Sequence, residues 1–344
     1  MKKFTSLGVA IFAALMMVGI TSQANAVTLG VYDKGLLVPI TTHGAPGIDT
    51  AVGILCSQDT TVYWTFFDKQ SNPIVDSDFP CTKNDLYHFS LNNEAPNTEG
   101  VEGYLVFTAN GGIKAADKTA ILNPNDNKSI SGNAFLIDTN SDDAIFLPVV
   151  PLCITDYAAG TDLSAMTNTS VVSLHYGFTR GDNCNIDVRY WLDPQYGACT
   201  NVILWTTQCL NQYWQWGGVN PVPGNCYFDT DPNNPTPWIL KCHLNVYDDE
   251  EHRTSVSIPL QCEVTNFFPS NITGWPNYID GFIRIPSTDL MPNAGDGAFG
   301  FSYVTSTTFK AAQSLLASES CGQVNCGAHR AAGGSTPKPC GCGQ

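Results

Sequence analysis

The sequence predicts an all-β protein made of two tandem Ig-like β-sandwich domains that arise from an internal duplication. Three observations lead to this prediction. Apolar and polar residues alternate over many short stretches, turn-forming clusters separate these stretches, and a set of motifs recurs in the same order in both halves. A period of two is typical of half-buried strands, and short strands with frequent turns favour sandwiches or barrels.

Residues 1–26 have the features of a secretory signal peptide. Two lysines follow Met1, an apolar run covers residues 7–20, and Ala-Asn-Ala at 24–26 is a small-residue cleavage site. We therefore expect an exported chain in the periplasm, at the cell surface or outside the cell. Once the leader is removed, we expect no transmembrane segment.

The charge balance narrows the range of partners. The 344 residues include 16 Lys and Arg against 31 Asp and Glu, which gives a formal net charge of −15. Such an acidic chain is poorly suited to a phosphate backbone or an anionic membrane surface. We expect no nucleic-acid partner.

The first sandwich domain is expected over residues 27–150. Its clearest strand patterns are the aromatic and β-branched run VYWTFF at 62–67 and GYLVFT at 103–108. A Pro-, Gly- and Asp-containing linker is expected at 151–167.

The second sandwich domain is expected over residues 168–307. Alternation is clearest at 186–192, and an insertion rich in aromatic residues and cysteines lies around 205–242. Residues 308–320 include an Ala- and Leu-rich stretch without a helix breaker, which predicts a short helix. Residues 321–344 read as a flexible cysteine-rich tail.

The internal repeat is divergent but ordered. VYWTFFD ends at Asp68 and HLNVYDD ends at Asp249, and each is followed by a cysteine and then by EGYLVF or DGFIRI. The interval from Asp68 to Gly103 nearly equals that from Asp248 to Gly281. Two copies of one sandwich explain this order, and chance similarity between generic β-sequences is the alternative.

All 13 cysteines lie after the leader, which fits an oxidising compartment. Their wide spacing in the body favours disulfides over zinc. The disulfide candidates are Cys56, Cys81, Cys209, Cys262, Cys226, Cys242, Cys184 and Cys199. If the repeat is real, Cys56–Cys81 and Cys209–Cys262 are equivalent bridges. The odd total implies at least one free, metal-bound or intermolecular thiol.

Two segments carry candidate metal ligands. In the tail these are thiolates and one imidazole, which suit zinc or reduced copper: Cys321, Cys326, His329, Cys340 and Cys342. Tail disulfides, cross-linking of subunits and recognition for sorting are the alternatives. Oxygen ligands for calcium are offered by Asp138, Asn140 and Asp142, but the loop lacks the Gly and the acid of a calcium loop, and a turn rich in Asx residues explains it more simply. No other cofactor is expected.

An aromatic group in the second half is a candidate ligand-binding surface: Trp205, Tyr213, Trp214 and Trp216. Exposed flat rings on a β-sandwich stack on sugar rings. The alternative is a small satellite core held together by the neighbouring cysteines. The chain has no G-x-S-x-G and no H-E-x-x-H motif, and we assign no catalytic residue.

Several stretches resemble segments of uncharacterised exported or cell-surface all-β proteins of Gram-negative bacteria: VYWTFFD, EGYLVFTANG, ISGNAFLIDTNSDDAIFLPVVPL and DGFIRIP. The resemblance implies surface localisation and an all-β body, and it implies no activity. The sequence thus predicts an exported, non-catalytic structural or adhesive protein. Its partner would be an extracellular protein, a glycan or a second copy of the chain, bound through sandwich edges and loops. The alternatives are carbohydrate binding through the aromatic insertion and metal or redox handling by the tail.

Overall fold

The computed structural model describes most of the chain between residues 32 and 314. The described ranges are 32–44, 47–70, 72–109, 111–114, 119–122, 130–140, 142–151, 178–179, 185–206, 226–229, 239–260, 264–286, 297–307 and 310–314. The predicted leader, nearly all of the predicted linker, most of the insertion and the whole tail lie outside these ranges.

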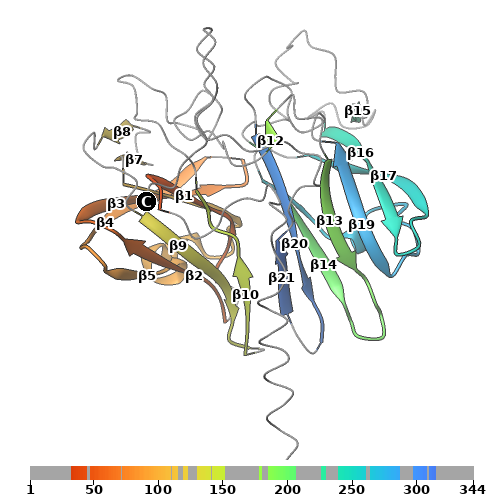
Figure 1. The fold of residues 1–344 in the computed structure, drawn as a ribbon, viewed down its shortest axis with the longest axis horizontal. Coiled ribbons are helices and arrows are strands. Elements are labelled where there is room, and N and C mark those ends of the chain that lie inside the picture. The colour runs from red at the N-terminus through yellow and green to blue at the C-terminus, as the bar shows by residue number, and fades with distance from the viewer. Residues whose placement is uncertain are drawn as a thin grey trace, which may run out of the picture.

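The N-terminal half forms two antiparallel sheets (Figure 1). Sheet I has the order β10-β9-β2-β5, with β2 (Ile48–Cys56), β5 (Leu86–Ser90), β9 (Ile130–Asp138) and β10 (Asp143–Leu147). Sheet II has the order β11-β1-β6-β3-β4, with β1 (Gly35–Thr41), β3 (Thr60–Asp68), β4 (Pro73–Cys81), β6 (Gly103–Thr108) and β11 (Val150–Pro151). A separate hairpin joins β7 (Gly111–Lys114) to β8 (Thr119–Leu122), and α2 (Leu91–Glu94) and η1 (Pro96–Thr98) follow β5.

The C-terminal half also forms two antiparallel sheets. Sheet III has the order β12-β20-β14-β18 with β21 beside β20, and consists of β12 (Phe178–Thr179), β14 (Cys199–Thr206), β18 (Val264–Phe267), β20 (Gly297–Thr305) and β21 (Lys310–Ser314). Sheet IV has the order β13-β19-β16-β15 with β17 beside β16, and consists of β13 (Asn185–Trp191), β15 (Cys226–Asp229), β16 (Ile239–Asp248), β17 (Arg253–Pro259) and β19 (Asp280–Pro286). The short η2 (Pro269–Asn271) follows β18.

The all-β prediction is confirmed, with sandwich-like packing in each half. In the first half, the Trp64 and Phe107 rings of sheet II meet the Phe89 ring of sheet I edge-on, at centroid distances of 5.0 and 5.1 Å. In the second half, buried side chains of sheets III and IV form their own core, which includes Leu204 and Ile283. Alternating strands bury one side chain in two, as the period-two pattern requires.

The two halves have the same strand connections. In sheets II and IV, β6 lies between β1 and β3 as β19 lies between β13 and β16, and β4 and β17 complete the two hairpins. In sheets I and III, the order β10-β9-β2-β5 corresponds to β21-β20-β14-β18. The registers also agree, because Ile54 pairs with Gly132 where Leu204 pairs with Gly300.

One turn is repeated in atomic detail. In the β3–β4 turn, Oδ1 of Asp68 accepts hydrogen bonds from the backbone N–H groups two and four residues later. In the β16–β17 turn, Oδ1 of Asp248 does the same. The acidic stretch that starts at Asp248 is therefore a hairpin turn ordered by an Asx side chain.

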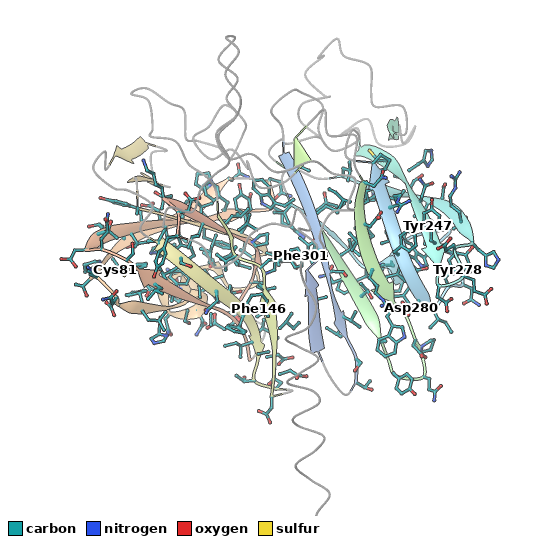
Figure 2. All side chains as sticks on the ribbon, in the orientation of Figure 1. Cys81, Phe146, Tyr247, Tyr278, Asp280 and Phe301 are labelled. Carbon is teal, nitrogen blue, oxygen red and sulfur yellow. A yellow bond between two sulfur atoms is a disulfide. The ribbon has the colours of Figure 1, made fainter. Side chains whose placement is uncertain are left out.

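The halves meet through the outer faces of sheets II and III. The Tyr104 ring on β6 contacts the Trp205 ring on β14 edge-on, at 5.8 Å and 86°. Ile203, Val264 and Phe301 of sheet III share the buried cluster of the first half, and Phe301 lies between the halves in Figure 2. The outer faces of sheets I and IV carry exposed side chains, among them Phe135 and Phe146 on sheet I and Arg189 on sheet IV, and we call them the open faces.

A polar contact closes one side of this interface. Lys69 Nζ lies 2.6 Å from Glu102 Oε2 and donates to Asn266 Oδ1 at 3.0 Å. Asn266 Nδ2 in turn lies 3.1 Å from both carboxylate oxygens of Glu102. Each charged group therefore has a partner at the boundary between the halves. Elsewhere, β10 of the first half lies beside β21 of the second (Figure 1).

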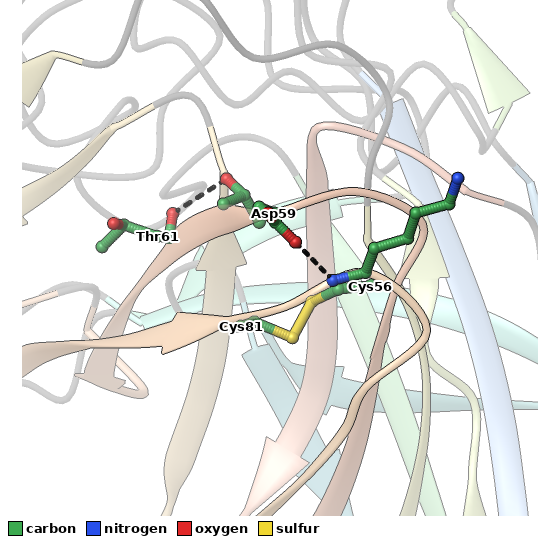
Figure 3. Close-up of a disulfide and its surroundings, with 6 residues drawn as sticks. Cys56, Asp59, Thr61 and Cys81 are labelled. Carbon is green, nitrogen blue, oxygen red and sulfur yellow. Dashed lines mark hydrogen bonds between the residues drawn. A yellow bond between two sulfur atoms is a disulfide. The ribbon is translucent and has the colours of Figure 1, made fainter.

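The disulfide predicted between Cys56 and Cys81 is confirmed (Figure 3). It joins the end of β2 in sheet I to the end of β4 in sheet II, so it links the two layers of the first half. Nearby, the backbone N–H of Lys83 donates to Asp59 Oδ1 at 2.8 Å. Cys209 and Cys262, the proposed equivalent pair, lie outside the described residues.

The described strands of the second half differ from the sequence prediction at the C-terminal stretch and at Cys199. The stretch 310–314, placed in a helix over 308–320, forms strand β21, which pairs with β20 from Phe301 to Thr305. The backbone groups of β20 offer a ladder that outweighs the helical preference of Ala and Leu. Cys199, taken as a disulfide candidate, is a free thiol. Its cross-strand neighbour is Thr305, and its Sγ lies 3.9 Å from Ser270 Oγ.

Candidate functional site: the open face of sheet IV

The open face of sheet IV consists of every second residue along the four strands β13, β19, β16 and β17. Val188 on β13, Val246 on β16 and Ile283 on β19 point inward and are fully buried. Their neighbours therefore point outward. These outward side chains include aromatic rings, guanidinium groups, hydroxyls and amides, a mixture unlike the apolar interior.

Four outward residues lie in one row across the sheet. Arg189 pairs with Phe282, Phe282 with Tyr247, and Tyr247 with Arg253. Figure 2 shows Tyr247 and Asp280 on this sheet, at the end of the molecule away from the first half. Residues opposite one another on neighbouring strands are close enough for their side chains to interact.

The centre of the row is an aromatic pair. The rings of Tyr247 and Phe282 are stacked, with centroids 4.5 Å apart and an interplanar angle of 6°. Arg284 extends the pair, because its Cζ lies 5.7 Å from the Tyr247 centroid and 5.4 Å from the Phe282 centroid. A guanidinium at this distance is attracted by the ring electrons. Aromatic rings and arginine are enriched at protein interfaces.

Two ion pairs flank the rings. Arg284 binds Asp187 through Nε and Nη2, at 2.8 and 2.7 Å. Arg189 binds both carboxylate oxygens of Asp280, with Nε at 3.2 Å from Oδ1. In each pair the hydrogen bond to the carboxylate raises the pKa of the guanidinium above its ordinary value. Bidentate geometry fixes the orientation of both arginines.

The rest of the face is polar and mostly uncharged. Ser255 Oγ donates to Asn245 Oδ1 at 3.2 Å, and Ser257 Oγ lies 2.8 Å from His243 Nδ1. Arg253 forms no ion pair with any described residue. The face therefore combines an apolar centre, a cation without an ion-pair partner among the described residues, and a polar surround, a mixture also found at protein interfaces.

Trp205 is not an exposed platform. Its side chain is fully buried against Tyr104, between the halves. Strand β14 is buried on both faces, so an apolar side chain is favoured at this position. The other three members of the predicted aromatic group, Tyr213, Trp214 and Trp216, lie outside the described residues.

The candidate calcium loop forms a turn between β9 and β10. The backbone N–H of Asn140 donates to Asp138 Oδ1 at 3.0 Å, which is the Asx-turn alternative. Within the described ranges, no group of three or more His, Cys, Asp or Glu side chains is placed to hold a metal ion. The five tail ligands, Cys321, Cys326, His329, Cys340 and Cys342, lie outside those ranges.

Two further cysteine candidates occupy facing strands. Cys242 on β16 is disulfide-bonded, and its cross-strand neighbour on β15 is Cys226. The position of Cys184 lies outside the described residues.

No helix in the part of the chain that the structure describes is long and apolar enough to cross a membrane.

Sequence reasoning identified the segments that hold Tyr247 and Phe282 but not the face. HLNVYDD and DGFIRI were recognised as repeat motifs, and alternation along them places both rings on the outward side. The sequence pattern does not show that β16 and β19 pair with each other, and it is this pairing that brings the two rings together.

No family model matches the chain, and no curated protein matches it in sequence.

Proposed function

We propose that this chain is an exported, non-catalytic structural or adhesive protein of the cell exterior that binds partners through the open face of sheet IV. In this proposal its two halves are Ig-like sandwiches that arose by internal duplication. The matching strand orders and the repeated Asx turn at Asp68 and Asp248 support the duplication. The Cys56–Cys81 disulfide suits the oxidising exterior of a cell.

One observation carries the proposal of a binding face. Phe67 and Tyr104 on sheet II are stacked at 5.0 Å and 9°, in the same register as Tyr247 and Phe282 on sheet IV. The first pair is fully buried, because it packs against Trp205 of the other half. The second pair is partly exposed. The chain thus repeats, on an open face, the structure that it uses as a contact surface internally.

The geometry favours a protein partner over a sugar. Each ring of the Tyr247–Phe282 pair covers one face of the other, so fewer flat ring faces are free to stack on a sugar. In the internal interface, Trp205 instead meets the equivalent pair edge-on. Edge-on contact with an apolar or aromatic side chain is typical of protein interfaces.

The first experiment tests location and adhesion together. In the producing cell, the chain should be found outside the cytoplasm and be digested by protease added to intact cells. Purified chain added to cells that lack it should be retained on their surface. Arg189→Glu should reduce this retention at least tenfold, because it places a carboxylate beside Phe282 and Asp280.

Ile74→Glu is the matched control, since Ile74 is exposed on β4 and belongs to neither open face. Recovery of the chain from the cytoplasm would contradict export. Equal retention of Arg189→Glu and the unmodified chain would contradict binding through sheet IV. Retention on cellulose or chitin that Arg189→Glu abolishes would support carbohydrate binding instead.

A further inference from the structure

The two open faces of the molecule correspond to the two faces that pack together inside it. Strand order and register make sheet IV the equivalent of sheet II, and sheet I the equivalent of sheet III. Inside the chain, the outer face of sheet II packs on the outer face of sheet III. The outer faces of sheet IV and sheet I, one of each kind, carry exposed side chains such as Arg189 and Leu86.

The open face of sheet I has apolar residues where sheet III has its contact residues. The registers place Leu55 at the position of Trp205, and Leu86 at the position of Val264. Val264 is fully buried between the halves, whereas Leu86 is 46% exposed. On the same face, the rings of Phe135 and Phe146 are also exposed, and they contact each other at 5.7 Å. Clustered exposed apolar side chains mark interaction sites.

Charged and polar groups also correspond. Asn266 of sheet III pairs across the strands with Ile203 and contacts Glu102 of the first half. The equivalent position on sheet I is His88, which pairs with Gly53 and is exposed. The equivalent of Glu102 on sheet IV is Asp280, since each precedes the glycine that pairs with the turn aspartate. A histidine would therefore meet a carboxylate, which is a complementary contact.

We propose that sheet I of one copy of this chain docks on sheet IV of a second copy, in the arrangement by which sheet III docks on sheet II within each chain. This proposal rests on the proposed function and adds a second copy of the chain to the partners that sheet IV binds. The two faces differ, so the contact is head-to-tail and each added copy leaves one face of each kind open. Such a contact builds open chains unless its rotation closes a ring.

The outer face of sheet IV is more polar than the outer face of sheet II, and this should weaken the contact between copies. Sheet II has Val106 and Leu37 where sheet IV has Arg284 and Asp187. The ion pair between these last two residues stays satisfied on the free surface. Association between copies should therefore be weaker than packing within the chain, and should depend on protein concentration.

Sedimentation velocity on the purified chain over a concentration series tests the proposal, with free thiols alkylated to block disulfide exchange. The weight-average mass of the unmodified chain should rise past that of a dimer as concentration increases. Arg189→Glu on sheet IV and Leu86→Glu on sheet I should each remain monomeric. An equimolar mixture of the two variants should form dimers and stop, because it contains one intact face of each kind.

Ile74→Glu serves as the control and should assemble as the unmodified chain does. Arg189 and Leu86 are largely exposed, so their substitution should leave the chain folded. Matching thermal melts for all variants would show this. A chain that stays monomeric at all concentrations would overturn the proposal. So would assembly that one variant abolishes and the other leaves intact, which indicates a symmetric contact. Cell retention lost in Arg189→Glu together with a monomeric chain would leave the proposed function standing while removing self-assembly.

Discussion

Gly281 lies against the carbonyl oxygen of Tyr247, so closely that a Cβ at position 281 would come within 1.9 Å of that oxygen. The same relationship exists in the first half, where a Cβ at Gly103 would lie 1.8 Å from the Phe67 carbonyl oxygen. Each glycine is the cross-strand partner of an aspartate, Asp68 or Asp248, whose side chain orders a hairpin turn. Because the two backbones approach so closely, the aromatic residue after each glycine can stack on the ring of the facing strand.

Gly281→Ala should therefore destabilise the protein strongly. The added methyl group must displace backbone, and overpacking of this kind costs about 3 kcal/mol of unfolding free energy. Urea unfolding followed by fluorescence measures the loss. Gly274→Ala is the control, since Gly274 has a positive φ of 81° but no atom within 4 Å of the added Cβ. It should cost only about 1 kcal/mol. Equal losses would show that the contact with Tyr247 relaxes freely.

The fold could be predicted from sequence where patterns are local. Alternation and β-branched runs indicate strands such as 62–67, 103–108 and 186–192, and the repeat matches Asp68 with Asp248 and Gly103 with Gly281, which are equivalent positions in the two halves. The stretch 310–314 has a helical local preference but forms a strand, because its pairing with β20 is a tertiary contact that local preference does not contain.

The candidate site could be predicted only in part for the same kind of reason. Trp205 lies in an apolar strand, and the sequence does not show that a second sheet covers its outward face. Tyr247 and Phe282 have the same alternating surroundings but remain open. Which outward face is covered depends on how the halves pack, and that information is spread over residues from both.

Trp205→Ala tests the buried position of this side chain. Removing a fully buried indole that packs against Tyr104 should lower the unfolding free energy by about 3–5 kcal/mol. Tyr196→Ala is the control, because Tyr196 is 47% exposed and its truncation should change stability by at most about 0.5 kcal/mol. A Trp205→Ala protein as stable as the unmodified chain would contradict the burial of this residue between the halves.

The β16–β17 turn should show a titrating histidine. The hydrogen bond from His252 to Asp248, and then the charge of Asp248, raise the pKa of His252 above its ordinary value. Asp248→Asn keeps the oxygen that accepts the backbone N–H groups but removes the charge, so the pKa of His252 should fall. A ¹H–¹³C NMR titration of the ring measures it. Glu250→Gln should lower this pKa less, since its carboxylate lies 3.8 Å from Nδ1.

The sign of the stability change follows from the raised pKa. Protonated His252 is favoured in the folded state, so its contribution is fully present below the unfolded-state pKa. The contribution is lost as pH rises through the folded-state pKa. The difference in stability between the unmodified chain and Asp248→Asn should accordingly shrink over that range. A difference that grows with pH would contradict the pairing.

The cysteine pattern gives a prediction for peptide mapping without reductant. Peptides that contain Cys226 and Cys242 should be recovered linked, because Cys242 is disulfide-bonded and Cys226 is its cross-strand neighbour. Cys199 should be alkylated by iodoacetamide in the folded protein. Recovery of Cys199 in a disulfide with Cys184 would contradict the free thiol.

The Cys56–Cys81 disulfide should contribute measurably to stability, whereas Cys199 should not. The bridge spans 25 residues and links sheets I and II, so it restricts the unfolded chain as well as the packed layers. Replacing both cysteines by alanine should lower the unfolding free energy by about 3 kcal/mol in urea. Cys199→Ala removes a thiol with no covalent partner and should cost less than about 1 kcal/mol. If the double variant were as stable as Cys199→Ala, the two layers of the first half would be held together by their aromatic core alone, with Trp64, Phe89 and Phe107 at its centre.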